Sequence, residues 1–85
     1  MRLQYFSPRQ LTGVLYYIEK TDRRGRQEII AVLRETENFV FGRIAASEID
    51  RSSEGDYWSN RKTAICNRYR EGRYDFTKSP QALRT

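Results

Sequence analysis

Apolar positions near the N-terminus follow two periodicities at once. Residues 11–18 contain the spacing of a helical stripe, and Ser7 and Pro8 offer a cap and a first-turn proline for a helix start. The same stretch is rich in β-branched and aromatic residues, which are typical of strands. We interpret residues 8–12 as one helical turn followed by a strand, and a full helix over residues 8–20 is the alternative.

Two further β-prone segments follow, each preceded by a turn signal. The first strand ends at Asp22 to Gly25, whose residues have the preferences of a type I turn. The second strand covers Gln27 to Leu33, and the polar stretch Arg34 to Asn38 then forms a second turn. The third strand covers Phe39 to Ile44. The pattern therefore predicts a three-stranded antiparallel meander.

One long helical segment follows the predicted meander. It runs from about Asp56 to Glu71, and Gly72 provides a stop signal. The predicted fold class is therefore α+β, with a small three-stranded antiparallel sheet followed by one main C-terminal helix. We expect a single compact domain over residues 1–76 and a flexible tail over residues 77–85.

The predicted turns fix which side chains share a face of the sheet. They place Ile18 opposite Ile29 and Leu33 opposite Val40, on an aliphatic face that suits the helix. The opposite face is aromatic and fringed with arginine. Its members are Leu15, Tyr17, Ile30, Val32, Arg34, Phe39, Phe41 and Arg43.

This aromatic face needs a cover of its own, because one helix covers only one face of a sheet. Three covers fit the pattern. A second copy of the chain would make a homodimer, and a partner protein or stacked nucleic-acid bases would make the face a binding surface. The third cover is the N-terminal segment 1–12, through Leu3, Tyr5, Phe6 and Leu11.

Positive charge is concentrated in the second part of the chain. Of the net charge of +5, residues 1–50 carry +1 and residues 51–85 carry +4. A basic segment with interleaved aromatics is typical of a nucleic-acid-binding surface. The sequence thus predicts an accessory or regulatory factor that contacts phosphates through a basic aromatic helix and the tip of the first hairpin. The predicted contacts are Arg61, Lys62, Arg68, Arg70 and Arg73 on the helix, and Arg23, Arg24 and Arg26 at the tip.

A protein partner is the alternative, because arginine and aromatic residues are also enriched at protein interfaces. In that reading the chain is an inhibitor or corepressor that docks an aromatic and arginine-rich face on a larger protein. The predicted interface residues are Trp58, Tyr69, Tyr17, Phe39, Phe41, Arg34 and Arg43.

The residue types needed for catalysis are scarce. The chain has no histidine and only one cysteine, Cys66, so it cannot build a structural zinc site or a Cys-His nucleophile within one chain. We therefore expect no enzyme activity, no metal and no cofactor. With no apolar leader or membrane span and no disulfide, the sequence predicts a cytoplasmic protein of a cell, or of a phage or other mobile element within it.

Overall fold

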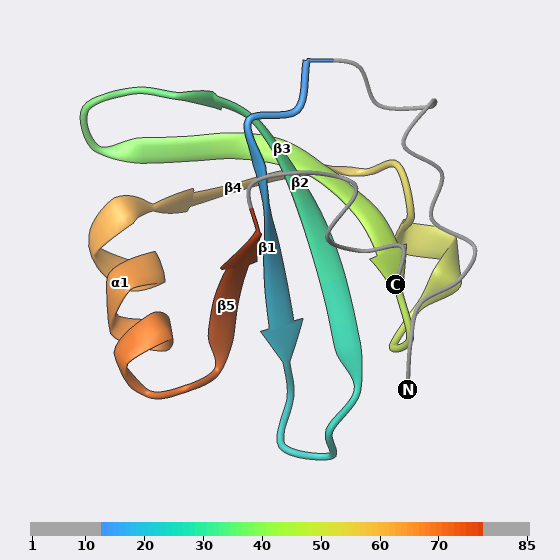
Figure 1. Cartoon of the computed structure of the whole chain (residues 1–85). Helices are drawn as coiled ribbons and strands as arrows, with labels where there is room; N and C mark the ends of the chain where they lie inside the picture. The colour runs from blue at the N-terminus through green and yellow to red at the C-terminus, as the bar shows by residue number, and fades with distance from the viewer. Residues whose placement is uncertain (1–12, 78–85) are drawn as a thin grey trace.

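A computed structural model describes residues 13–77, and five strands and one α-helix lie within them (Figure 1). The chain is therefore α+β, but the predicted three-stranded sheet is wrong, because two further strands extend it. The strands are β1 (Tyr16–Thr21), β2 (Gln27–Glu35), β3 (Phe39–Ser47), β4 (Tyr57–Arg61) and β5 (Tyr74–Thr77). A 3₁₀ helix, η2 (Arg51–Ser53), follows β3, and the helix α1 (Lys62–Arg70) separates β4 from β5.

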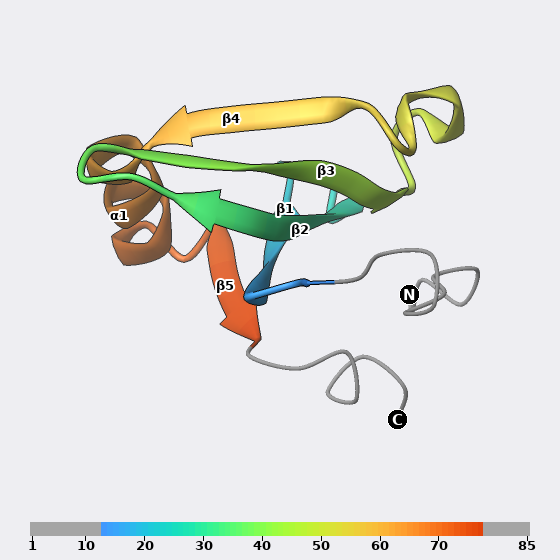
Figure 2. The same cartoon turned by 90° about the horizontal axis from the view of Figure 1, so that it is seen from above.

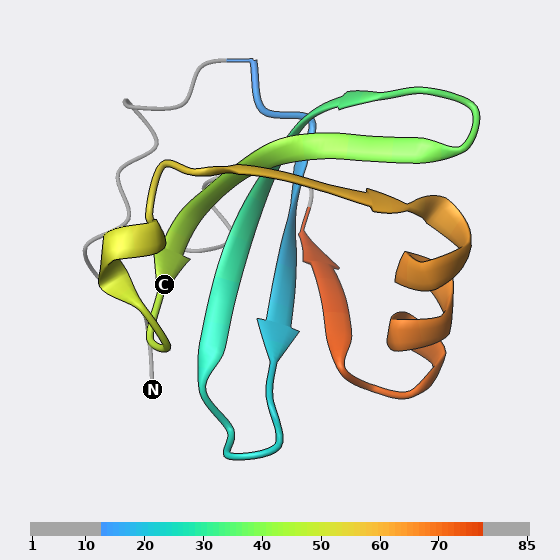
Figure 3. The same ribbon diagram turned by 180° about the vertical axis from the view of Figure 1, so that it is seen from behind.

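All five strands belong to one antiparallel sheet with the order β4-β3-β2-β1-β5. Its edges, β4 and β5, are joined in the chain by α1. The sheet is strongly coiled, so that β4 crosses β1 and runs across the direction of β5 (Figures 1 and 3). Seen from above, α1 lies next to the β2–β3 turn (Figure 2). We call the side of the sheet that packs against α1 the inner face, and the other side the outward face.

The long helix predicted from Asp56 to Glu71 is wrong in its first part. Tyr57–Arg61 forms β4 instead, because its aromatic residues and its alternation suit pairing with β3. The helix that follows ends where the glycine signal placed it. Gly72 adopts φ 76°, its N–H donates to Tyr69 O and that of Arg73 donates to Arg68 O, which is the Schellman pattern. Within residues 13–77, no helix is long and apolar enough to cross a membrane.

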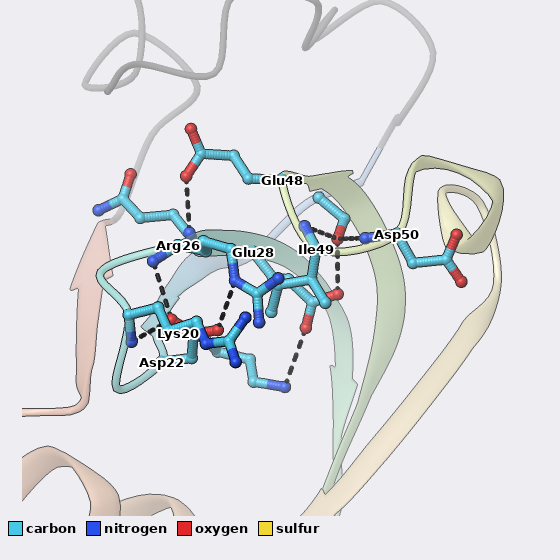
Figure 4. A network of polar contacts seen from close by, with 10 residues as sticks. Lys20, Asp22, Arg26, Glu28, Glu48, Ile49 and Asp50 are labelled. Atoms are coloured by element: carbon cyan, nitrogen blue, oxygen red, sulfur yellow. Dashed lines mark hydrogen bonds and ion pairs between the residues drawn. The ribbon is translucent and has the colours of Figure 1, made fainter.

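The β1–β2 turn forms at Asp22 to Gly25, but it contains one more residue than the predicted register assumed. Asp22 Oδ1 accepts hydrogen bonds from the N–H groups of Arg24 and Arg26, both at 2.9 Å, and Asp22 N–H donates to Arg26 O (Figure 4). Arg26 is therefore part of the turn. Ile18 consequently pairs with Ile30 and not with Ile29, so the predicted register is off by one residue.

The shifted register reverses the two faces of β2. Ile30 and Val32, expected on the aromatic face, lie in the inner core with Ile18. Arg34 nevertheless points outward, because a register irregularity between Val32 and Arg34 leaves Leu33 without a direct partner on β3 and changes the alternation. The core between α1 and the sheet consists of Ile18, Ile30, Val32, Val40, Ile65 and Tyr74.

A second, smaller cluster lies on the outward face of β1 to β3. It contains Tyr17, Ile29, Ala31 and Ala46, and all four side chains are buried. The predicted cover for this face, residues 1–12, lies outside the described residues.

The amine of Lys20 shows how closely the two edges of the sheet approach. Its Nζ lies 5.8 Å from the ring centroid of Trp58 on β4 and 5.8 Å from that of Tyr74 on β5. The same amine pairs with Glu28 at 3.4 Å. A single ammonium group thus contacts aromatic rings from both edge strands and joins them through cation–π contacts.

Replacing Glu19 with glutamine is expected to stabilise the protein at neutral pH. Glu19 on β1 lies directly opposite Asp75 on β5, and burial, followed by the charge of Asp75, raises the pKa of Glu19. Because folding raises the pKa of Glu19, protonated Glu19 stabilises the fold fully only below pH 4.5, which is its ordinary pKa. This stabilisation is lost as the pH rises through the raised pKa. Like charges opposite each other on neighbouring strands cost about 0.2–1 kcal/mol.

Urea unfolding of the Glu19→Gln protein tests this expectation. The variant should unfold at higher urea than the unchanged protein at neutral pH, and the two should coincide well below pH 4.5. Glu37→Gln, at an exposed position in the β2–β3 turn, serves as the control. It should leave the urea midpoint of unfolding unchanged at both pH values. A gain of equal size at both pH values would contradict the assignment to ionised Glu19.

Candidate nucleic-acid interface

Six arginine and aromatic side chains form a continuous surface on the outward face of β2, β3 and β4. They alternate with the core residues of the same strands, because neighbouring side chains in a strand point to opposite faces. We call this surface the ladder, and its members are Arg34, Phe39, Phe41, Arg43, Tyr57 and Arg61.

The pairing of the strands sets the rows of the ladder. Phe41 on β3 lies opposite Arg34 on β2 and opposite Ser59 on β4. The neighbouring rows pair Phe39 with Arg61 and Arg43 with Tyr57. Each aromatic ring therefore has an arginine directly across from it on the next strand.

Each arginine lies against the face of the ring opposite to it. The guanidinium carbon Cζ is 4.3 Å from the ring centroid of Phe41 for Arg34, 4.2 Å from Tyr57 for Arg43 and 5.1 Å from Phe39 for Arg61. These distances are those of cation–π contacts. The rings of Phe39 and Phe41 lie 6.1 Å apart at an interplanar angle of 32°. The contacts hold the side chains in place while leaving them on the surface.

The ladder is accessible and carries positive charge. Tyr57 is 83% exposed, Arg34 and Arg61 are exposed, and the remaining members are partly exposed. Arg43 is oriented further by a 2.8 Å hydrogen bond from its Nη1 to Gly55 O. Neither β3 nor β4 contains an acidic residue, so the guanidinium groups meet no carboxylate within these two strands.

The predicted contacts on the helix do not form one surface with the ladder, with the exception of Arg61. Lys62 pairs with Glu35 at 3.2 Å on the inner side of the sheet. Arg70 reaches Asn67 at 3.5 Å, and Arg73 lies 3.6 Å from the acidic Glu71. Arg68 is partly buried on α1. The helix cations are therefore spread around the helix.

The predicted contacts at the hairpin tip lie apart from the ladder. β2 separates the tip from Arg34 by about 23 Å, at about 3.3 Å per residue. Arg23 and Arg24 are exposed there, but Arg26 binds Asp22 through its Nε at 2.9 Å. Desolvation alone would raise the pKa of Asp22, but the hydrogen bonds from Arg26 and Arg24 lower it overall. The carboxylate of Asp22 and the guanidinium of Arg26 thus pair within the turn itself.

The predicted aromatic interface residues divide into two groups. Phe39, Phe41, Arg34 and Arg43 come together in the ladder as described above. Tyr17 also faces outward but is buried in the smaller cluster, and Trp58 packs against the inner core. Tyr69 lies on α1, where its ring is 5.1 Å from that of Phe76.

Sequence reasoning missed the contribution of β4 to this surface. Tyr57 and Arg61 enter the ladder because Tyr57–Arg61 is a strand, in which Tyr57, Ser59 and Arg61 share one face. The signal was the alternation of these residues with Trp58 and Asn60, which a helical reading of the segment conceals. Comparisons of the chain with protein-family models, with curated protein sequences and with solved structures find no match.

Proposed function

We propose that the protein binds single-stranded nucleic acid on the ladder and acts as an accessory or regulatory factor without catalysis of its own. The observation that carries this proposal is the row of three arginine–aromatic contacts on an accessible surface of β2, β3 and β4. Aromatic side chains that offer a face to successive bases, together with cations along the backbone, are the usual elements of a single-strand-binding surface.

The spacing of the ladder supports single strands over duplexes. Phe39 and Phe41 are two residues apart on β3, which corresponds to about 6.8 Å along an antiparallel strand. Successive bases in one strand of a duplex rise by only about 3.4 Å. The rings therefore suit bases that are drawn apart along an extended strand. Helix α1 has only nine residues and its cations diverge, so it supports duplex reading less well.

A salt titration tests the proposal. We expect a labelled oligothymidylate of about twelve nucleotides to bind more tightly than a duplex of the same length, with an affinity that falls as salt rises. If the three ladder arginines each neutralise one phosphate, the slope of log K against log salt should be about −2, from about −0.7 per single-strand contact. Fluorescence anisotropy measures both values. Absence of binding at low salt, or binding that salt does not weaken, would contradict the proposal.

A protein-binding modulator is the second candidate, and one observation favours it. Tyr57, with 83% of its surface exposed, lies on β4, which forms an edge of the sheet. Exposed edges accept additional strands, and tyrosine and arginine are enriched at protein hot spots. This candidate predicts recovery of one stoichiometric protein in a pulldown that Tyr57→Ala abolishes, with no binding to the oligonucleotide. For either candidate we place the protein in the cytosol, where an exposed free thiol such as Cys66 stays reduced.

A further inference from the structure

A cavity of about 380 Å³ lies between α1 and the inner face of the sheet. Its size falls within the range of about 300–1,000 Å³ that is typical of ligand pockets. Its walls are mostly apolar and include Val40, Ile65, Phe76 and the ring of Tyr16. Tyr16 and Phe76 meet edge to face, with ring centroids 6.1 Å apart at an interplanar angle of 87°. The pocket therefore presents aromatic and aliphatic surface to a flat ligand.

Two opposite charges, on Glu35 and Lys62, also line the cavity. Lys62 Nζ lies 3.2 Å from Glu35 Oε1, and their side chains are 39% and 36% exposed. An ion pair of this exposure contributes little to stability, so a ligand that bonds to both groups can separate them at small cost. The pair offers a hydrogen-bond donor beside an acceptor and carries no net charge. It therefore favours a neutral ligand with an acceptor and a donor on one edge.

The hydroxyl of Tyr16 is a third polar group of this pocket. Burial, followed by the charge of Glu35 and a hydrogen bond to it, raises the pKa of Tyr16. The hydroxyl thus keeps its proton throughout the neutral range and remains a hydrogen-bond donor beside Glu35.

We propose that this pocket binds one nucleobase, with its ring between the apolar walls and its polar edge against Glu35 and Lys62. A nucleobase is flat and neutral and presents adjacent donors and acceptors on its Watson–Crick edge. An aliphatic ligand would form no hydrogen bond with either charged group, which would stay paired with each other. A carboxylate ligand would meet a lysine whose charge Glu35 already balances.

The pocket and the ladder meet at the same corner of the fold. Arg34, Phe39 and Arg61 belong to the ladder, and the residue that directly follows each of them lines the pocket. This corner is where the β2–β3 turn lies beside the first turn of α1, joined by the hydrogen bond from Lys62 N–H to Asn38 O (Figure 1). The ladder and the pocket lie on opposite faces of the sheet here, so a base at the end of a strand on the ladder would reach the pocket by passing around the β2–β3 turn. The entry of a base from a bound strand rests on the proposed function. A free nucleoside would bring the same kind of base to the pocket without a strand.

The experiment separates these two sources of the base. Free adenosine, guanosine, cytidine and uridine are titrated separately into the protein, and the NMR signals of the Val40 and Ile65 methyl groups are followed. Cys66→Trp places a bulky ring at a pocket residue that is exposed, and Asn67→Trp places the same ring at the next, exposed position outside the lining. Oligothymidylate affinity is measured for both variants.

We expect at least one nucleoside to shift the methyl signals saturably, and Cys66→Trp to abolish these shifts and to weaken oligonucleotide binding about tenfold. Asn67→Trp should change neither. Oligonucleotide binding that Cys66→Trp leaves intact, with no nucleoside shifts, would overturn the pocket inference and leave the proposed function standing. Nucleoside shifts without oligonucleotide binding would support the pocket as a site for free nucleosides and overturn the proposed function. Absence of both would overturn both, and the nucleoside titration remains decisive if Cys66→Trp does not fold.

Discussion

Replacing Gly42 with alanine is expected to cost about 2–4 kcal/mol of stability, out of the roughly 4–13 kcal/mol that a domain of this size has. Gly42 on β3 is buried opposite Val32 on β2 and Trp58 on β4. A Cβ atom at this position would overlap the backbone carbonyl of Ala31. Because both groups belong to paired strands, neither can move without disturbing the centre of the sheet.

Urea unfolding followed by the fluorescence of Trp58, the single tryptophan, measures this loss. The matched control is Gly25→Asn in the β1–β2 turn. Gly25 has φ 79° and open space around its Cβ position, and asparagine tolerates this conformation better than most residues. The control should cost less than about 1 kcal/mol. A Gly42→Ala protein that is no less stable than the control would show that β2 and β3 do not approach as closely as described.

The double variant Phe39→Leu, Phe41→Leu is expected to reduce single-strand affinity about a hundredfold or more. Stacking on an aromatic side chain is worth about 1–3 kcal/mol per base, and leucine keeps apolar volume while removing the flat face. Neither phenylalanine belongs to a core cluster, so the variant should remain folded. Loss of the cation–π contacts with Arg34 and Arg61 should cost only about 0.5–1 kcal/mol each.

Two single charge changes serve as controls for this result. Arg61→Gln removes a charge from the ladder and should lower the salt slope by about 0.7. Arg24→Gln makes the same change at the hairpin tip and should leave the slope unchanged, because the tip lies about 23 Å from Arg34. Equal effects of the two changes would indicate a general attraction to positive charge. Unchanged affinity in the double variant would rule out stacking on the ladder.

The hairpin and the helix stop were predictable because each depends on a few local residues. The β1–β2 turn needs only an Asp that accepts backbone hydrogen bonds and a Gly with positive φ, and the helix end needs only Gly72. The register was predicted wrongly because local residue preferences do not determine it. Whether Arg26 belongs to the turn or to β2 depends on its contact with Asp22, and that one residue reverses the faces of β2.

The members of the ladder were predicted in part, and for different reasons. Phe39, Phe41 and Arg43 share a face whatever their partner strand does, because alternation within β3 does not depend on register. Arg34 joins them only because the irregularity at Leu33 reverses the alternation of β2 a second time. The wrong register and the missed irregularity each reverse the face assigned to Arg34, so its predicted face is correct. Ile30 and Val32 precede the irregularity, so only the register error affects them and their predicted face is wrong.

The place of β4 and β5 could not be predicted from short segments. Tyr57–Arg61 has helical neighbours on its C-terminal side, and only the long β3 provides the partner that makes it a strand. β5 has four residues and pairs with β1, which lies far away in the chain. Long-range pairing of this kind leaves little trace in the pattern of the strand itself.

The position of β1 between β2 and β5 has a consequence during synthesis of the chain. β1 and β2 can pair as soon as their hairpin leaves the ribosome, but the other edge of β1 must wait for β5. At about 5–20 residues per second, that wait lasts several seconds. During it, the amide and carbonyl groups on that edge of β1 are open to another nascent chain. Crowded translation of one message therefore favours chains that exchange β5, and slower initiation should reduce this misassembly.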